Sequence, residues 1–134
     1  MEEHNQFYSN YTMALFFSPD DRSYTYEHFN TWLLEQKLRL MDEGYIHFII
    51  LTPKHHLPDC WFVQAMKKPE GILFEVSKNE EGKNRVYAHS PTSPEELRRY
   101  LRELLEEDRV PEVSDWEYVG EFRSPDEDQQ NNQK

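Results

Sequence analysis

The sequence contains a single cysteine and only four glycines, and each shortage argues against a class of site. Cys60 has no second cysteine with which to form an internal disulfide. The glycines are spaced too far apart for the glycine-rich loops that bind phosphates, since they stand at Gly44, Gly71, Gly82 and Gly120. No run of eighteen apolar residues is present either, which predicts that no helix spans a membrane.

Basic residues are scarce relative to acidic ones. The chain has 15 lysines and arginines against 26 aspartates and glutamates, which gives a net charge of −11. An acidic surface repels phosphates, so direct binding to nucleic acid is disfavoured. The segment 103–128 contains eleven acidic residues and two arginines, and it holds −9 of the net charge. Such a field attracts a basic protein partner, although an acidic surface can also serve solubility alone.

The length of 134 residues fits one domain with one core. The N-terminus, Met1-Glu-Glu-His-Asn, lacks the basic and apolar regions of a signal peptide, so we expect a soluble, cytoplasmic protein. We expect a loose start over residues 1–10 and a folded domain over residues 11–123. Residues 124–134 are polar and acidic without an apolar anchor, which predicts a disordered tail.

The clearest single element is a helix near the C-terminal end of the predicted domain. Ser93 and Glu96 have the spacing of a capping box, and Pro94 stands at the first helical position, where no N–H donor is needed. Apolar side chains then recur every three or four residues along one face, at Leu97, Tyr100, Leu101, Leu104 and Leu105. The pattern predicts a helix that ends after Glu107.

The remaining patterns predict a second helix and six strands. The second helix is expected over residues 26–43, capped by Ser23 or Thr25, with Phe29, Trp32, Leu33 and Leu40 on one side. Leu34, Leu38 and Met41 are expected to widen this apolar stripe. The strands are expected over residues 11–17, 45–51, 60–66, 71–77, 85–89 and 116–122. The order β-α-β-β-β-β-α-β and the short turns predict an α+β fold, in which two amphipathic helices cover one face of a mainly antiparallel sheet.

No catalytic motif stands out, and we expect no catalytic residue, metal or cofactor. His55-His56 and Cys60 invite a zinc hypothesis, but the chain has no second pair of ligands at the usual spacing. A nucleophilic cysteine needs a neighbouring positive charge or a helix N-terminus to lower its pKa. The sequence around Cys60 shows no evident helix N-terminus or lysine for this role. A pocket between sheet and helices, lined by His47, Cys60 or His89, remains an open alternative.

The last predicted strand alternates acidic with large apolar residues. Asp115, Glu117 and Glu121 occupy alternate positions, which predicts an acidic solvent-facing side. The apolar side chains on the other face are expected to be Trp116, Tyr118 and Phe122.

The order of elements over residues 29–119 resembles that of the small immunity proteins of bacterial polymorphic toxin and contact-dependent inhibition systems. The local sequences that support the resemblance are Ser93-Pro94-Glu95-Glu96, which opens a helix, and Val113-Ser114-Asp115-Trp116-Glu117, which leads into the last strand. The resemblance implies a non-enzymatic inhibitor that binds a cognate toxin, often a basic nuclease or deaminase, and blocks it by occlusion.

Under this hypothesis acidic side chains take the place of nucleic-acid phosphates, and aromatic anchors slow release. The candidate partner-binding residues are Glu106, Glu107, Asp108, Glu112, Asp115, Trp116, Glu117 and Glu121. Two alternatives stay open. One is another acidic inhibitor or DNA mimic of phage origin. The other is a small ligand-binding domain or enzyme that uses the pocket between sheet and helices.

Overall fold

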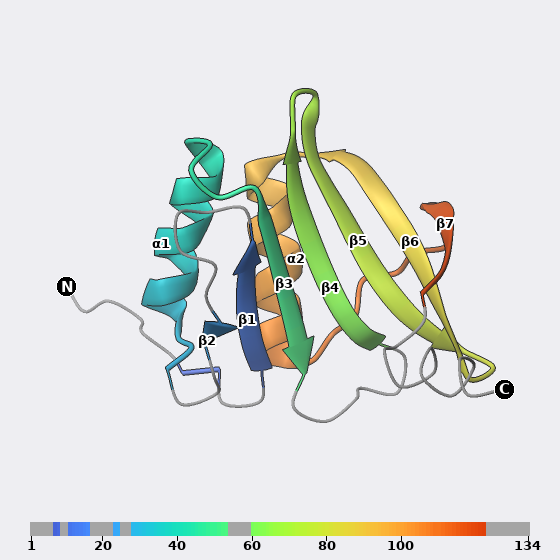
Figure 1. Ribbon diagram of the computed structural model, residues 1–134. Coiled ribbons are helices and arrows are strands. Elements are labelled where there is room, and N and C mark those ends of the chain that lie inside the picture. The colour runs from blue at the N-terminus through green and yellow to red at the C-terminus, as the bar shows by residue number, and fades with distance from the viewer. Residues whose placement is uncertain (1–6, 9–10, 17–22, 25–27, 54–59, 123–134) are drawn as a thin grey trace, which may run out of the picture.

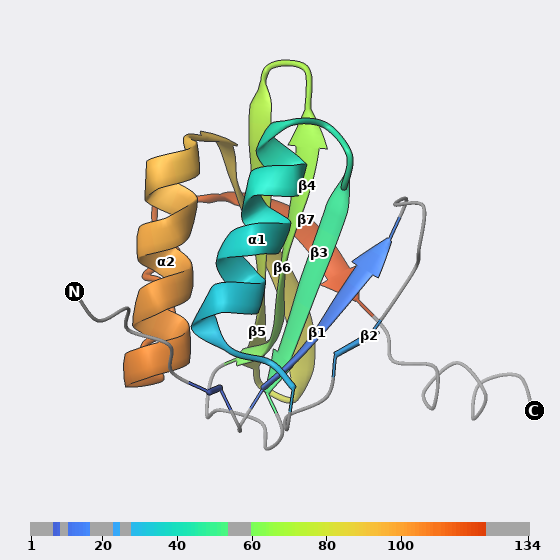
Figure 2. The same ribbon diagram turned by 90° about the vertical axis from the view of Figure 1, so that its left-hand side faces the viewer.

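The computed structural model describes residues 7–8, 11–16, 23–24, 28–53 and 60–122, with the backbone alone for 12–16, 23–24 and 122. Two helices lie on the same face of an antiparallel sheet (Figures 1 and 2). In chain order the elements are β1 (Tyr11–Phe16), β2 (Ser23–Tyr24), α1 (Thr31–Asp42), β3 (Phe48–Pro53), β4 (Cys60–Lys68), β5 (Gly71–Glu80), β6 (Lys83–Thr92), α2 (Pro94–Glu107) and β7 (Glu117–Phe122). The predicted α+β architecture is confirmed.

The sheet has seven described strands in the order β2-β1-β3-β4-β5-β6-β7. β4, β5 and β6 are long strands joined by two-residue turns, and they form consecutive hairpins. The two-residue β2, which the sequence does not predict, pairs with β1 at one edge. β7 pairs with β6 at the other edge, so β1 and β7 are separated by β3, β4, β5 and β6.

The core lies between the helices and one face of the sheet. Register pairs such as Val63 with Val76 and Ala65 with Phe74 bring small and large apolar side chains together on that face. α1 and α2 bury apolar side chains against them, namely Leu34, Leu38, Met41, Leu97, Leu101, Leu104 and Leu105. Removing this apolar surface from water is the main driving force that holds the two layers together. None of the helices in the described ranges is long and apolar enough to cross a membrane.

The helix α2 has the predicted start. The backbone N–H of Glu96 donates to the Ser93 hydroxyl oxygen over 3.1 Å, and the Ser93 N–H donates to the Glu96 carboxylate over 2.9 Å. The helix ends at Asp108, whose backbone is left-handed (φ 53°) and whose N–H donates to the Leu104 carbonyl. The predicted capping box and helix end are both confirmed.

The helix α1 differs from the prediction. It begins at Thr31, because the Asn30 side chain caps it by accepting a 2.8 Å hydrogen bond from the Leu33 N–H. The predicted cap Ser23 belongs to β2, and Thr25 lies outside the described residues. The side chain of Trp32 is 57% exposed, so its assignment to the core side was wrong. Leu34, Leu38 and Met41 form the core-facing stripe, and Trp32 lies on another side of the helix.

Candidate functional site

The eight predicted partner-binding residues fall into two groups at different places in the fold. Glu106, Glu107 and Asp108 lie at the end of α2, where Asp108 contacts β1. The other five lie on the segment that connects α2 to β7 and on β7 itself, and β7 is the strand at the far edge of the sheet (Figure 1). Five inter-strand steps of about 4.8 Å separate β1 from β7, which is roughly 24 Å. Glu117 and Glu121 on β7 therefore lie far from Asp108, while Glu112, four residues after Asp108, lies on the segment between them.

Two acids at the end of α2 are bonded to tyrosines of the N-terminal part of the chain. The Tyr11 hydroxyl donates to the Asp108 carboxylate over 2.9 Å and is also 3.0 Å from the Leu104 carbonyl oxygen. Burial raises the pKa of Tyr11, and the bond to Asp108 raises it further. The Tyr8 hydroxyl reaches Glu106 over 3.5 Å. These contacts give Glu106 and Asp108 a structural role.

The acids around β7 point into solvent. Glu112, Asp115, Glu117 and Glu121 are all exposed. Glu121 lies 3.7 Å from the ammonium group of Lys83, and the side chains of both residues are about half exposed. Screening by water makes such a surface pair weak. We call these four carboxylates the β7 acidic group. Glu106, Glu107 and Asp108 at the end of α2 are exposed as well.

A β-bulge changes the predicted faces of β7. Tyr118 pairs with Tyr87 and Gly120 pairs with Val86, so Val119 is an extra residue on β7. Beyond the bulge Glu121 pairs with Arg85. Because Tyr87 and Arg85 stand two residues apart on β6, Tyr118 and Glu121 share one face of the sheet. The prediction that Glu121 lies on the face opposite Tyr118 was wrong, and the side chain of Phe122 is outside the described part.

Trp116 and Tyr118 are the aromatic residues of this segment whose side chains the structure describes, and they have different surroundings. Trp116 is half-buried, and its ring centroid lies 5.3–5.8 Å from those of Phe74, Tyr100 and His89. Tyr118 is 51% exposed, and its ring lies 5.5 Å from that of Tyr87. Trp116 therefore contributes to the core, and the accessible aromatic side chain is Tyr118.

An open hollow of about 350 Å³ adjoins Tyr118 and is lined by Arg85, Tyr87 and Tyr118. Glu80 organises its wall, because it accepts a 2.7 Å hydrogen bond from the Tyr87 hydroxyl and lies 3.6 Å from the Arg85 guanidinium. The bond to Glu80 raises the pKa of Tyr87. No local sequence pattern predicts this hollow, since it depends on the pairing of β5, β6 and β7.

The residues of the alternative pocket hypothesis do not converge. Cys60 is fully buried in the core, and its sulfur lies 3.6 Å from the Phe62 carbonyl oxygen. His47 is exposed beside the end of α1, where its ring bonds the Gly44 carbonyl. His89 lies beside Trp116, and its Nδ1 is 2.7 Å from the Thr92 hydroxyl oxygen. Within the described ranges, no three histidine, cysteine or acidic side chains are grouped to hold a metal, and His55 and His56 fall outside those ranges.

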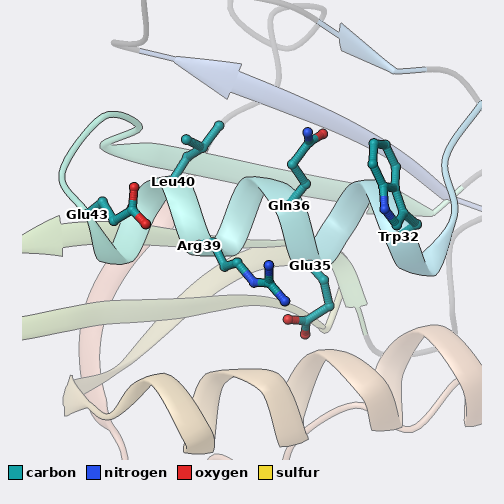
Figure 3. A pocket seen from close by; sticks show the side chains of 6 residues that line it. All are labelled: Trp32, Glu35, Gln36, Arg39, Leu40 and Glu43. Carbon is teal, nitrogen blue, oxygen red and sulfur yellow. The ribbon is translucent and has the colours of Figure 1, made fainter. Parts of the chain in front are cut away.

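A second hollow, of about 300 Å³, lies on the outer side of α1. It is lined by Trp32, Glu35, Gln36, Arg39, Leu40 and Glu43 (Figure 3). Figure 3 shows Trp32, Gln36 and Leu40 projecting from one side of the helix, while Glu35 and Arg39 point toward the side where α2 lies. The spacing 32, 36 and 40 is a helical stripe. The sequence pattern marked Trp32 and Leu40 but not Gln36, and in the structure Trp32 and Gln36 are exposed while Leu40 packs partly against the core.

Comparison with known proteins gives no further assignment, because no family model, curated protein or solved structure matches this chain.

Proposed function

We propose that this chain is a small acidic inhibitor of the immunity type, which binds a basic, nucleic-acid-targeting toxin in the bacterial cytoplasm and blocks it by occlusion. The observation that supports the proposal best is the β7 acidic group. Its four carboxylates are exposed, and Glu117 and Glu121 belong to the same strand as Tyr118, whose side chain is 51% exposed beside an open hollow. An exposed aromatic side chain near charged ones is typical of protein-binding surfaces.

The carboxylates and the tyrosine have different roles in the proposed complex. Exposed charges of one sign steer an oppositely charged partner and raise the association rate. Tyr118 supplies apolar contact area and a polar hydroxyl, which suits it to act as an anchor that slows dissociation. Glu106 and Asp108 add to the long-range field of the protein, but their carboxylates are already bonded to Tyr8 and Tyr11.

Capture of the partner from the native host tests the proposal. The tagged chain should retain a basic protein at low salt and release it as the salt concentration rises, because screening weakens contacts between exposed charges. Replacing Asp115, Glu117 and Glu121 together by lysine should weaken binding by about tenfold or more and flatten its salt dependence. Addition of the chain should also inhibit the activity of the captured protein.

A matched control separates this surface from net charge. Replacing Glu43, Glu70 and Glu95 by lysine changes the net charge by the same amount at exposed positions away from β7. This control should retain most of the binding. Equal losses in both triple variants contradict a specific role for the β7 acidic group, and a partner that keeps its full activity when bound contradicts inhibition.

A further inference from the structure

The strand β7 is an edge strand that buries little of itself. It is the last strand of the sheet order, and no other strand in the described part of the chain pairs with its outer side. Its four non-glycine residues with described side chains are all exposed, namely Glu117, Tyr118, Val119 and Glu121. The outer edge of an antiparallel strand presents alternate N–H and C=O groups that can pair with a further strand.

The charges on this edge disfavour pairing with a second copy of the same chain. If two β7 strands paired antiparallel about Glu117, Glu117 of one copy would lie directly opposite Glu117 of the other. A parallel pairing in register would place Glu117 opposite Glu117. Like charges directly opposite each other destabilise a strand pair, whereas opposite charges stabilise it. These two registers with a second copy are therefore disfavoured, and the edge favours a strand that carries lysine or arginine.

The side chains on the two faces of β7 specify the strand further. Glu117 pairs with Ala88, on one face of the sheet, and Tyr118 pairs with Tyr87, on the other. The Tyr118 face also adjoins the hollow lined by Arg85 and Tyr87. A complementary strand would thus place a basic side chain beside Glu117 and an apolar side chain beside Tyr118, which is an alternating pattern.

We propose that an extended segment of the protein partner, alternating basic with apolar residues, pairs with the outer edge of β7 and becomes the eighth strand of the sheet. This inference rests on the proposed function and specifies how the same surface binds. Backbone hydrogen bonds then supply affinity, while side chains on the two faces supply selectivity.

Amide hydrogen exchange of the isotope-labelled full chain tests strand addition directly. The probe is the synthetic peptide Val-Lys-Val-Lys-Val-Lys-Val, and the charge-matched control is Gly-Lys-Gly-Lys-Gly-Lys-Gly, which has low strand propensity. With the probe, exchange of outward-pointing β7 amides should slow by about tenfold or more, because these groups become hydrogen-bonded. With the control, β7 exchange should stay unchanged. If both peptides slow β7 exchange equally, or if neither peptide slows it, the proposal is wrong.

A charge-reversal variant controls for loss of binding that is caused by misfolding. The Glu117→Lys variant should lose protection by the valine–lysine peptide and gain protection by Val-Glu-Val-Glu-Val-Glu-Val, because the cross-strand pair is restored with reversed signs. A variant that binds neither peptide while remaining folded contradicts the proposal. The proposed function is tested separately. If the captured partner is inhibited in a salt-dependent way but leaves β7 exchange unchanged, inhibition stands and strand addition is wrong.

Discussion

The Tyr11 hydroxyl donates a 2.9 Å hydrogen bond to the carboxylate of Asp108, across 97 positions of sequence. The bond joins β1 to the left-handed residue that ends α2, and Tyr11 is only 1% exposed. It therefore ties the last turn of the helix to the strand beneath it. Asp108 therefore has a structural role, although it belongs to the acidic segment 103–128.

Substitution of Asp108 should separate its two structural contributions. Asp108→Ala loses the acceptor for Tyr11 and places alanine in a left-handed conformation, so it should lower the free energy of unfolding by about 2–4 kcal/mol. Asp108→Asn keeps an acceptor and tolerates the conformation, so the loss should be about 1 kcal/mol or less. Urea denaturation measures both. Equal losses for the two variants would contradict this explanation, because only asparagine keeps an acceptor and tolerates the left-handed conformation.

The capping box predicts a pH dependence of stability. The Ser93 N–H bonds to the Glu96 carboxylate and lowers the pKa of Glu96 in the folded protein. A carboxyl group with a depressed folded pKa stabilises the protein above its unfolded pKa, and this contribution is lost as the pH falls through the folded pKa. Glu96→Gln should therefore be less stable than the unmodified chain at neutral pH, and the difference should vanish in acid. Urea denaturation across this pH range measures the difference, and a gap that persists in acid would contradict the assignment.

Gly71 is required where β5 begins beside Pro91. Its φ is +137°, and a Cβ atom added there would lie 2.7 Å from the Pro91 Cβ. Gly71→Ala should lower the free energy of unfolding by about 2–4 kcal/mol through backbone strain and overpacking. Gly44→Ala is the matched control, since Gly44 has φ +89° but nothing within 4 Å of the added Cβ. The control should cost about 1–2 kcal/mol from strain alone. Thermal or urea unfolding compares them, and equal costs would exclude the clash with Pro91.

The predictions from sequence succeeded where the signals are local. The capping box at Ser93 and the leucine spacing define α2 within fourteen residues, and the structure has this helix as predicted. The hairpins of β4, β5 and β6 are also formed by neighbouring segments. The fold class follows from these elements, because two amphipathic helices and a run of hairpins have few ways to bury their apolar faces.

The incorrect predictions concern residues whose positions depend on contacts between segments that are distant in the sequence. Trp32 has the spacing of a core residue, but the orientation of α1 on the sheet places Leu34, Leu38 and Met41 inward. The bulge at Val119 reassigns the face of Glu121, and no residue pattern marked it. The bond between Tyr11 and Asp108 likewise has no local signal. Each of these features is decided by packing between elements, which periodicity cannot show.

Trp116 and Tyr118 stand two residues apart and should respond differently to truncation. Trp116→Ala removes contacts with Phe74, Tyr100 and His89, so it should lower the free energy of unfolding by about 3 kcal/mol. Tyr118→Ala removes an exposed ring and its contact with Tyr87, so it should cost about 1 kcal/mol or less.

The same pair distinguishes stability from binding when urea denaturation is combined with titration of the captured partner. Tyr118→Ala should weaken binding by about tenfold or more while the chain stays folded, as expected for an exposed aromatic anchor in a protein interface. Trp116→Phe retains an aromatic ring and should leave binding nearly unchanged if Trp116 acts through the core. If Trp116→Phe weakens binding while Tyr118→Ala does not, the partner contacts Trp116, and the anchor at the β7 acidic group has been assigned to the wrong residue.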